Sequence, residues 1–171
     1  VLEPACGSGN LIAALLRAGH DPANILGIEK DPEFAEYARE RFLGRVRIVC
    51  GSFFFDDAID EGPFGVFQPD IVLTNPPFEN NLHTRFVLRG LELCEWVIAV
   101  IPTTFEFTQE RDRTLWASKG IVVRRALLPE RVDYGGSDCP SFESVALKIG
   151  RRVSPRGRDD VRIVSEEVWT P

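Results

Sequence analysis

Four consecutive residues are the clearest candidates for a chemical role in this chain: Asn75, Pro76, Pro77 and Phe78. Proline has a fixed φ and no N–H and also restricts the residue before it, so the segment is stiff. A stiff segment can aim the amide oxygen of Asn75 and the carbonyl oxygen of Pro76 at a single amino group. Each acceptor takes one hydrogen, which frees the nitrogen lone pair for attack on an electrophile. Phe78 then offers a flat face for a planar substrate.

A second candidate site lies near the start of the chain, where Gly7 and Gly9 precede apolar residues at helical spacing. Glycines allow a tight turn and a close approach to a ligand, and free N–H groups at a helix start favour a carboxylate or phosphate. Glu29 follows at the end of a predicted strand, where a carboxylate can accept from both hydroxyls of a ribose. These residues together predict a site for a nucleoside-containing ligand.

Alternating strands and helices must position these residues. Short apolar runs predict a strand that ends near residue 3 and further strands at 25–28, 46–49, 71–73, 96–101, 121–128 and 144–150. Helices are predicted from residue 11 to Gly19 and at 31–42, 84–94 and 110–118, the second burying Phe34, Ala38 and Phe42 or their neighbours. Residues 129–142 are too few for a helical crossover and predict a hairpin.

This order predicts an α/β fold, a three-layer sandwich around a mostly parallel seven-stranded sheet with an antiparallel last strand. Ligands of such sheets bind at the carboxyl ends of the strands, and Asn75 follows the predicted central strand at 71–73. A short strand at 161–164 follows. We expect one main domain at residues 1–152 and a C-terminal extension at 153–171.

Composition narrows the class of protein. The chain has 171 residues, 44% of them hydrophobic, and no long apolar run, so we expect no membrane span. Its four cysteines are far apart, which argues against a metal site or a disulfide framework and favours a reducing, cytoplasmic location. The absence of methionine and the start within a strand indicate a fragment that lacks its natural N-terminal segment.

Charge is unevenly distributed. The net charge is −6, which argues against a general nucleic-acid binder, but residues 1–80 hold 13 acidic and 6 basic residues (−7) and residues 81–171 hold 13 and 14 (+1). The arginines of the second half would therefore face a polyanion if one binds. Solvated surface arginines are an equally good interpretation of any single one.

Two motifs support a family resemblance. Asn75-Pro76-Pro77-Phe78 resembles the (Asn/Asp/Ser)-Pro-Pro-(Tyr/Phe) motif of S-adenosylmethionine-dependent amino methyltransferases, and the run from Glu3 to Asn10 resembles the first motif of the class I enzymes. The resemblance covers residues 1–150 and implies S-adenosyl-L-methionine as cofactor, with no metal. Ser52 stands where these enzymes commonly have an aspartate for the adenine amino group of the cofactor, and it can still accept a hydrogen bond.

The resemblance implies roles for named residues. The catalytic residues would be Asn75, Pro76, Pro77 and Phe78. The cofactor would contact Glu3, Pro4, Ala5, Cys6, Gly7, Gly9, Asn10, Glu29, Lys30, Ser52, Phe53 and Asn75. The substrate would contact Phe78, Arg131, Tyr134 and Phe142, the last three from the predicted hairpin. For Tyr134 and Phe142, a purely structural role that holds the loop is an equal alternative.

The resemblance implies methylation of adenine N6 in DNA, with nucleic acid as the partner. Three alternatives remain open on the sequence: an RNA adenine methyltransferase, a protein glutamine methyltransferase, and a catalytically silent subunit that binds nucleic acid or a partner protein. No separate target-recognition domain follows the last strand, so sequence specificity would come from the hairpin loop, a missing domain or a specificity subunit.

Overall fold

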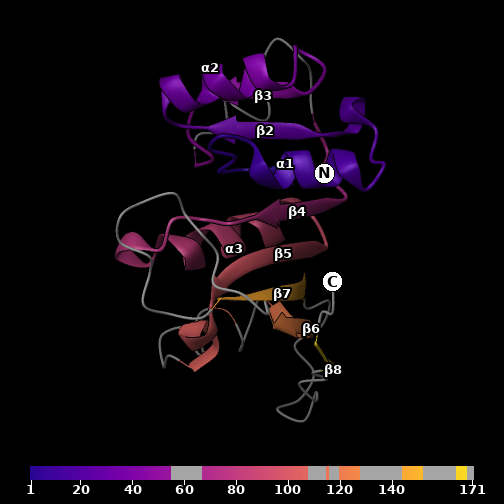
Figure 1. Cartoon of the computed structure of the whole chain (residues 1–171). Coiled ribbons are helices and arrows are strands. Elements are labelled where there is room, and N and C mark those ends of the chain that lie inside the picture. The colour runs from indigo at the N-terminus through magenta and orange to yellow at the C-terminus, as the bar shows by residue number, and fades with distance from the viewer. Residues whose placement is uncertain (55–66, 108–114, 116–119, 128–143, 152–164, 169–171) are drawn as a thin grey trace.

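The computed structural model describes residues 1–54, 67–107, 115, 120–127, 144–151 and 165–168, which form one mixed sheet covered by helices (Figure 1). The strands are β1 (Leu2–Glu3), β2 (Leu26–Glu29), β3 (Arg47–Cys50), β4 (Ile71–Thr74), β5 (Trp96–Pro102), β6 (Gly120–Leu127), β7 (Ser144–Arg151) and β8 (Ser165–Val168). The α-helices are α1 (Asn10–Arg17), α2 (Pro32–Arg41) and α3 (Leu82–Leu93). Short 3-10 helices are η1 (Pro22–Asn24), η3 (Glu79–Asn81) and η4 (Thr103–Phe107).

The order of strands in the sheet is β3-β2-β1-β4-β5-β7-β6-β8. All paired strands run parallel except β7, which is antiparallel to both β5 and β6. The predicted sheet of seven strands with an antiparallel last strand is therefore confirmed, and β8 adds an eighth strand beside β6. The predicted strand at 161–164 and connection at 129–142 lie outside the described residues, as does the predicted helix at 110–118 apart from Leu115.

The chain changes direction across the sheet at β1. After β1 it builds β2 and β3 on one side, and it then returns to place β4 on the other side of β1. The connections that leave β1 and β4 at their carboxyl ends therefore run to opposite faces, which opens a crevice between them. This crevice is the usual ligand-binding position in open α/β sheets.

Helices cover both faces of the sheet, as the predicted three-layer sandwich requires. Leu26 and Ile28 of β2 belong to the core cluster that contains α3, whereas Gly27 between them faces α1, where an added Cβ would lie 3.0 Å from Cδ1 of Ile12. On the opposite face α3 packs closely because Gly90 leaves room for Val97. Burial of each large apolar side chain in these two layers contributes about 1.5–3 kcal/mol.

Helix α2 begins where the sequence predicts and buries the predicted face, except at Phe34. The Asp31 carboxylate caps it by accepting from the backbone N–H of Glu33 at 2.9 Å. The predicted burial of Phe34 is wrong, since this residue is 53% exposed. Its neighbour Ala35 is buried instead, together with Ala38 and Phe42. Small alanines on the inward face let the helix approach the sheet, so residue size alone does not identify the buried side.

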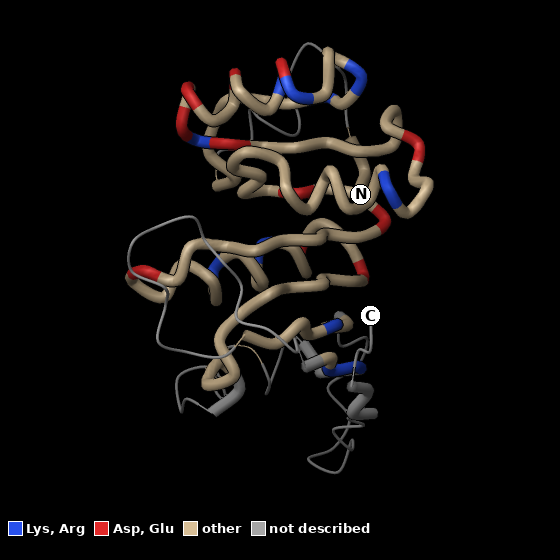
Figure 2. Tube along the Cα trace, in the orientation of Figure 1, with Lys and Arg blue, Asp and Glu red and all other residues tan. Residues whose placement is uncertain are grey.

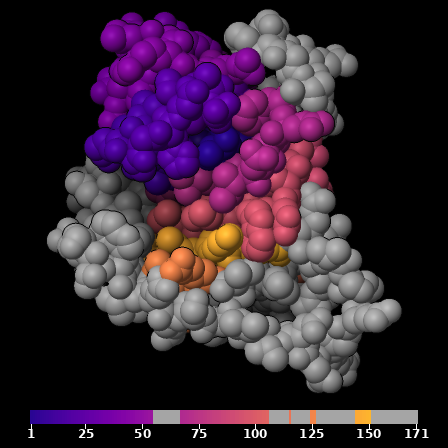
Figure 3. Space-filling model, turned by 90° about the vertical axis from the view of Figure 1, so that its right-hand side faces the viewer, coloured from indigo at the N-terminus to yellow at the C-terminus, as the bar shows by residue number. Residues whose placement is uncertain are grey.

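The distribution of charge follows the layers. Helix α2 carries residues of both signs, while β4 and β5 carry none (Figure 2). Uncharged strands in the middle of the sheet are typical of parallel sheets buried on both faces. The space-filling view shows the N-terminal residues lying directly against the segment with β4 and α3 (Figure 3). None of the described helices is long and apolar enough to cross a membrane.

Candidate functional site

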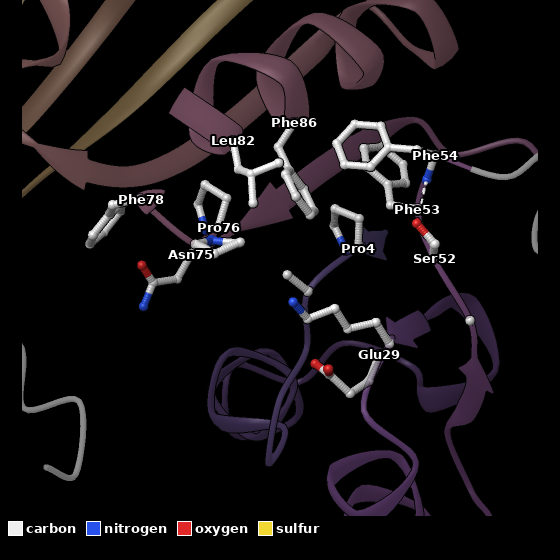
Figure 4. Close-up of a pocket in the computed structure, with 14 residues that line it drawn as sticks. Pro4, Glu29, Ser52, Phe53, Phe54, Asn75, Pro76, Phe78, Leu82 and Phe86 are labelled. Carbon is white, nitrogen blue, oxygen red and sulfur yellow. Dashed lines mark hydrogen bonds between the residues drawn. The ribbon is translucent and has the colours of Figure 1, made fainter. Parts of the chain in front are cut away.

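A cavity of about 610 Å³ lies at the carboxyl ends of β1 to β4. Its size falls in the range of small-molecule and cofactor sites. The lining residues come from four connections that follow these strands and from the start of α3 (Figure 4). They are Pro4, Ala5, Glu29, Lys30, Gly51, Ser52, Phe53, Phe54, Asn75, Pro76, Pro77, Phe78, Leu82 and Phe86.

Asn75 follows β4 directly and lines one end of the cavity (Figure 4). Its amide Oδ1 is buried and has no hydrogen-bond partner among the residues that the structure describes. A buried acceptor without a donor costs free energy, so this atom suits a ligand that brings an N–H or O–H group. Pro76, next in the chain, is buried and fixes the backbone on which the amide is mounted.

The ring of Phe78 lies beside Asn75 at the same end of the cavity and is half-buried (Figure 4). It meets the ring of His83 edge to face, with the centroids 6.0 Å apart. His83 in turn lies 5.2 Å from the ring of Phe105, which is buried in the core. The aromatic contacts therefore link Phe78 to the rigid part of the molecule and limit the orientations of its ring.

Two left-handed residues turn the chain sharply after Phe78. Asn80 and Asn81 have φ values of 48° and 63°, and asparagine tolerates this region better than most residues. The turn leads into α3 so that Leu82 and Phe86, one helical turn apart, return to the cavity. Neither Leu82 nor Phe86 was predicted as a site residue. Their spacing of four residues, which places both on one face of a helix, could have indicated them.

Glu29, at the end of β2, is held by the backbone on both sides of its carboxylate. Its Oε2 accepts from the N–H of Gly7 at 2.8 Å, and its Oε1 accepts from the N–H of Asp31 at 2.9 Å. An ionised carboxylate has about four acceptor positions, so both oxygens keep capacity for a ligand. Gly7 does not line the cavity itself, and its contribution is to orient Glu29.

The glycine-rich turn before α1 is supported from below by the end of α2. Gly9 has a φ of 84°, and an added Cβ would lie 2.5 Å from the ring of Phe42, so only glycine fits here. The Arg41 guanidinium donates from Nη1 to the carbonyl of Ser8 at 2.7 Å and to Oδ1 of Asn10 at 2.8 Å. Helix α2 thus fixes the turn that positions Glu29.

Glu3 is buried beneath the cavity rather than lining it. Only 1% of the residue is exposed; its Oε1 accepts from the N–H of Ala5 at 3.2 Å, and its Oε2 has no partner among the described residues. Burial is the main cause that raises the pKa of Glu3 to about 8. The Thr74 hydroxyl is nearby and fully buried but not in hydrogen-bonding geometry. The Glu3 carboxyl is therefore largely neutral at pH 7.

The other end of the cavity is aromatic (Figure 4). The rings of Phe53 and Phe86 stack with centroids 5.2 Å apart, and the Phe54 ring meets that of Phe86 edge to face at 5.0 Å. Ser52 lies beside them, and its Oγ accepts from the backbone N–H of Phe54 at 3.3 Å. Flat apolar walls with one polar group suit an aromatic ring system with polar edges.

The structure brings most of the predicted site residues to the cavity and places the others elsewhere. The predicted residues that line it are Pro4, Ala5, Glu29, Lys30, Ser52, Phe53, Asn75, Pro76, Pro77 and Phe78. Those behind or beside the lining are Glu3, Cys6, Gly7, Gly9 and Asn10. Burial raises the pKa of the Cys6 thiol to about 12, so it is an inert thiol at neutral pH. Arg131, Tyr134 and Phe142 lie outside the described residues.

Four lining residues were not predicted: Gly51, Phe54, Leu82 and Phe86. Phe54 stands within three consecutive phenylalanines, and the sequence does not tell which of the three faces a cavity. The part of the chain that the structure describes holds no group of three metal-ligating side chains. The site thus consists of hydrogen-bonding groups and aromatic walls.

Comparison with known proteins gives the fold a context. No protein-family model matches the chain. An 80-residue segment is 36% identical to an uncharacterized methyltransferase, YrrT, of Bacillus subtilis (strain 168); the match covers 47% of this chain and 33% of the relative. The chain therefore spans about a third of the length of this curated relative.

Solved structures match over most of the chain. A candidate RNA methyltransferase of Pyrococcus horikoshii has a TM-score of 0.67 at 18% identity over 91% of this chain and 74% of its own. A candidate class I S-adenosylmethionine-dependent methyltransferase of Listeria monocytogenes gives 0.63 at 15%, over 96% and 57%. The M protein of the type I restriction enzyme EcoKI gives 0.56 at 18%, over 88% and 39%. At these identities the matches establish the Rossmann-like class I methyltransferase fold.

Proposed function

We propose that this protein transfers a methyl group from S-adenosyl-L-methionine to an exocyclic amino group, with adenine N6 in DNA as the first candidate acceptor. The observation that carries the proposal is the buried, unpaired Oδ1 of Asn75 at one end of a cavity whose other end is aromatic. The cavity occupies the crevice between β1 and β4, where this sheet topology binds ligands. The class I methyltransferase fold supports the same function.

The lining fits the cofactor along its length. Phe53, Phe54 and Phe86 would hold the adenine ring, and Glu29 would accept from the ribose hydroxyls. The turn at Gly9, with the N-terminus of α1 behind it, favours a carboxylate such as that of the methionine part. When bound, S-adenosyl-L-methionine supplies a methyl group on a positively charged sulfur, which is a good leaving group.

The acceptor would enter at the Asn75 end. Oδ1 of Asn75 and the carbonyl of Pro76 would each accept one hydrogen of the amino group, which localises the nitrogen lone pair toward the methyl group. Phe78 would stack on the ring that carries this amino group. An adenine in a duplex must first leave the base stack, at a cost of a few kcal/mol that this stacking partly offsets.

The choice between DNA and RNA depends on the motif and on the structural neighbours. The order of the two motifs, with the run from Glu3 to Asn10 before residues 75–78, resembles that of DNA adenine-N6 methyltransferases and favours DNA adenine. Similarity to the EcoKI M protein supports this acceptor, whereas similarity to a candidate RNA methyltransferase makes RNA adenine the second candidate. Arg131, Tyr134 and Phe142 remain the proposed substrate contacts, with a specificity subunit or a further domain as proposed partner.

The test measures tritium transfer from labelled cofactor to duplex DNA, single-stranded DNA and RNA, using the full chain. We expect incorporation into DNA and a loss of at least about 100-fold in Asn75→Ala, because removal of one preorganised polar contact typically costs that much. The matched control is Asn24→Ala, an exposed asparagine on η1 that should leave the rate unchanged.

Cofactor binding separates a catalytic loss from a folding defect. Calorimetric titration with S-adenosyl-L-homocysteine should still show binding to Asn75→Ala, because Asn75 is only one of the residues that would contact the cofactor. Transfer at undiminished speed by Asn75→Ala would contradict the proposed role of this residue. Incorporation only into RNA would assign the second candidate acceptor.

A further inference from the structure

Four residues form the aromatic end of the cavity, and Ser52 is the polar one among them. Ser52 lies beside Phe54 and Phe53 there, with Phe86 further along the wall, while Glu29 lies between this end and Asn75 (Figure 4). A planar base that enters this end therefore meets aromatic faces and a single hydroxyl. The three rings, at centroid separations of 5.0–5.7 Å, bind any base through its face and distinguish poorly between bases.

The hydroxyl of Ser52 has a fixed oxygen and a free hydrogen. Its Oγ accepts from the N–H of Phe54 at 3.3 Å, which holds the side chain in one position. A hydroxyl has one donor and two acceptor positions, so one donor and one acceptor position stay available. Rotation about the Cβ–Oγ bond selects which of them faces the cavity.

We propose that Ser52 makes this site tolerant of the group at purine C6, so that it accepts a cofactor with a 6-oxo base as well as one with a 6-amino base. The inference rests on the proposed function, since it concerns the base of the bound cofactor. A 6-amino group donates, and the free lone pair of Ser52 Oγ can accept from it. A 6-oxo group accepts, and the same hydroxyl can donate to it.

A carboxylate at position 52 would behave differently. An ionised carboxylate only accepts, so it pairs with a 6-amino group, whereas it repels a 6-oxo oxygen unless it shifts to the N1–H that the 6-oxo base also carries. Leaving polar groups unpaired in a desolvated site costs about 1–3 kcal/mol, which corresponds to roughly a 5-fold to 150-fold loss of affinity. The substitution Ser52→Asp should therefore convert a tolerant site into a selective one.

The experiment titrates the full chain calorimetrically with S-adenosyl-L-homocysteine and with its deaminated analogue, S-inosyl-L-homocysteine. We expect dissociation constants within about 5-fold of each other for wild type. For Ser52→Asp we expect the analogue to bind roughly 5-fold to 150-fold more weakly than S-adenosyl-L-homocysteine. Ser52→Ala should weaken both ligands by similar factors, which controls for loss of the hydroxyl. Thermal unfolding of each variant reports whether it folds.

The outcomes separate this inference from the proposed function. If S-adenosyl-L-homocysteine gives no heat with wild type, the proposed function fails and the inference falls with it. If it binds but S-inosyl-L-homocysteine binds to wild type more than about 5-fold more weakly, only the tolerance at Ser52 is overturned. If both ligands bind wild type alike and Ser52→Asp does not change the ratio of their dissociation constants, the site is tolerant but Ser52 is not the cause. The assignment to this residue is then overturned.

Discussion

The buried carboxyl of Glu3 makes the stability of this protein depend on pH. In the folded chain burial raises its pKa to about 8, whereas in the unfolded chain the carboxyl has its ordinary value near 4.5. Below pH 4.5 the group is protonated in both states. As the pH rises toward 8, the unfolded state loses the proton while the folded state keeps it, which favours unfolding by at most about 1.4 kcal/mol for each pH unit.

The substitution Glu3→Gln should remove this contribution. We expect the free energy of unfolding of wild type to fall relative to that of the variant between pH 5 and pH 8, by about 2–4 kcal/mol. Urea unfolding at pH 5, 6, 7 and 8 measures the difference, and the exposed Glu33→Gln provides a control with the same chemical change. Parallel pH profiles for wild type and Glu3→Gln would show that Glu3 titrates normally.

Single residues differ in how well their roles could be predicted from the sequence. Asn75, Pro76 and Phe78 were predicted as a stiff binding segment and do line the cavity, because prolines impose their conformation locally. Glu3 was predicted to touch the cofactor, but the structure buries it. Its burial depends on β1 lying between β2 and β4, and the sequence around Glu3 carries no signal of that packing.

Among the helices, α2 supports the glycine-rich turn before α1, at Gly7 to Gly9, without lining the cavity. Arg41 at its end donates to the carbonyl of Ser8 and to the side chain of Asn10, and Phe42 packs against Gly9. These contacts span more than thirty residues of sequence and hold the turn in the conformation that presents the Gly7 N–H to Glu29. Preorganisation of this kind lowers the ordering cost of ligand binding.

The substitution Arg41→Ala should weaken cofactor binding through the turn. Loss of two charge-assisted hydrogen bonds at an exposed side chain should cost about 1 kcal/mol of preorganisation, so we expect about 5-fold weaker binding of S-adenosyl-L-homocysteine. Calorimetric titration measures this change, and Arg41→Lys should recover part of it. Arg17→Ala, which removes a charge from the far end of α1, is the control. If Arg41→Ala and Arg17→Ala bind S-adenosyl-L-homocysteine with equal affinity, Arg41 does not support the site through the turn.

The elements themselves were predicted to within one or two residues over most of the described chain. Capping at Asp31 and the proline stop after β4 are local signals and gave accurate bounds. The inward face of α2 was wrong at Phe34 because alanines, not aromatics, face the sheet there. Phe86 was missed because it reaches the cavity only through the sharp turn at Asn80 and Asn81, a conformation that the sequence does not specify.

For the whole molecule, ligand binding should appear as a gain in stability. A ligand that binds only the folded state stabilises it by about 2.7 kcal/mol when its concentration is 100 times its dissociation constant. We therefore expect S-adenosyl-L-homocysteine to raise the midpoint of thermal unfolding of both wild type and Asn75→Ala. Homocysteine alone, which lacks the base and the ribose, serves as the control. An unchanged midpoint at saturating concentration would contradict a cofactor site in this cavity.

The sheet topology was predictable because strands and helices alternate and the connection at 129–142 is too short for a helix between parallel strands. The acceptor was not, because the fold is shared by enzymes that act on different substrates. Residues 81–171 hold most of the arginines that a polyanion would meet, but the cavity lining found in the structure ends at Phe86. Acceptor choice therefore rests on the motif resemblance and on biochemical tests.

Every described residue of the cavity wall falls between positions 4 and 86, so this wall is encoded almost wholly in the first half of the chain. Strands β5 to β8 extend the sheet without entering that wall. If the proposed function holds, such an arrangement is modular: recombination downstream of α3 would exchange the acceptor while leaving the cofactor site in place. Chimaeras joined after residue 93 should therefore inherit donor affinity from one parent and target preference from the other.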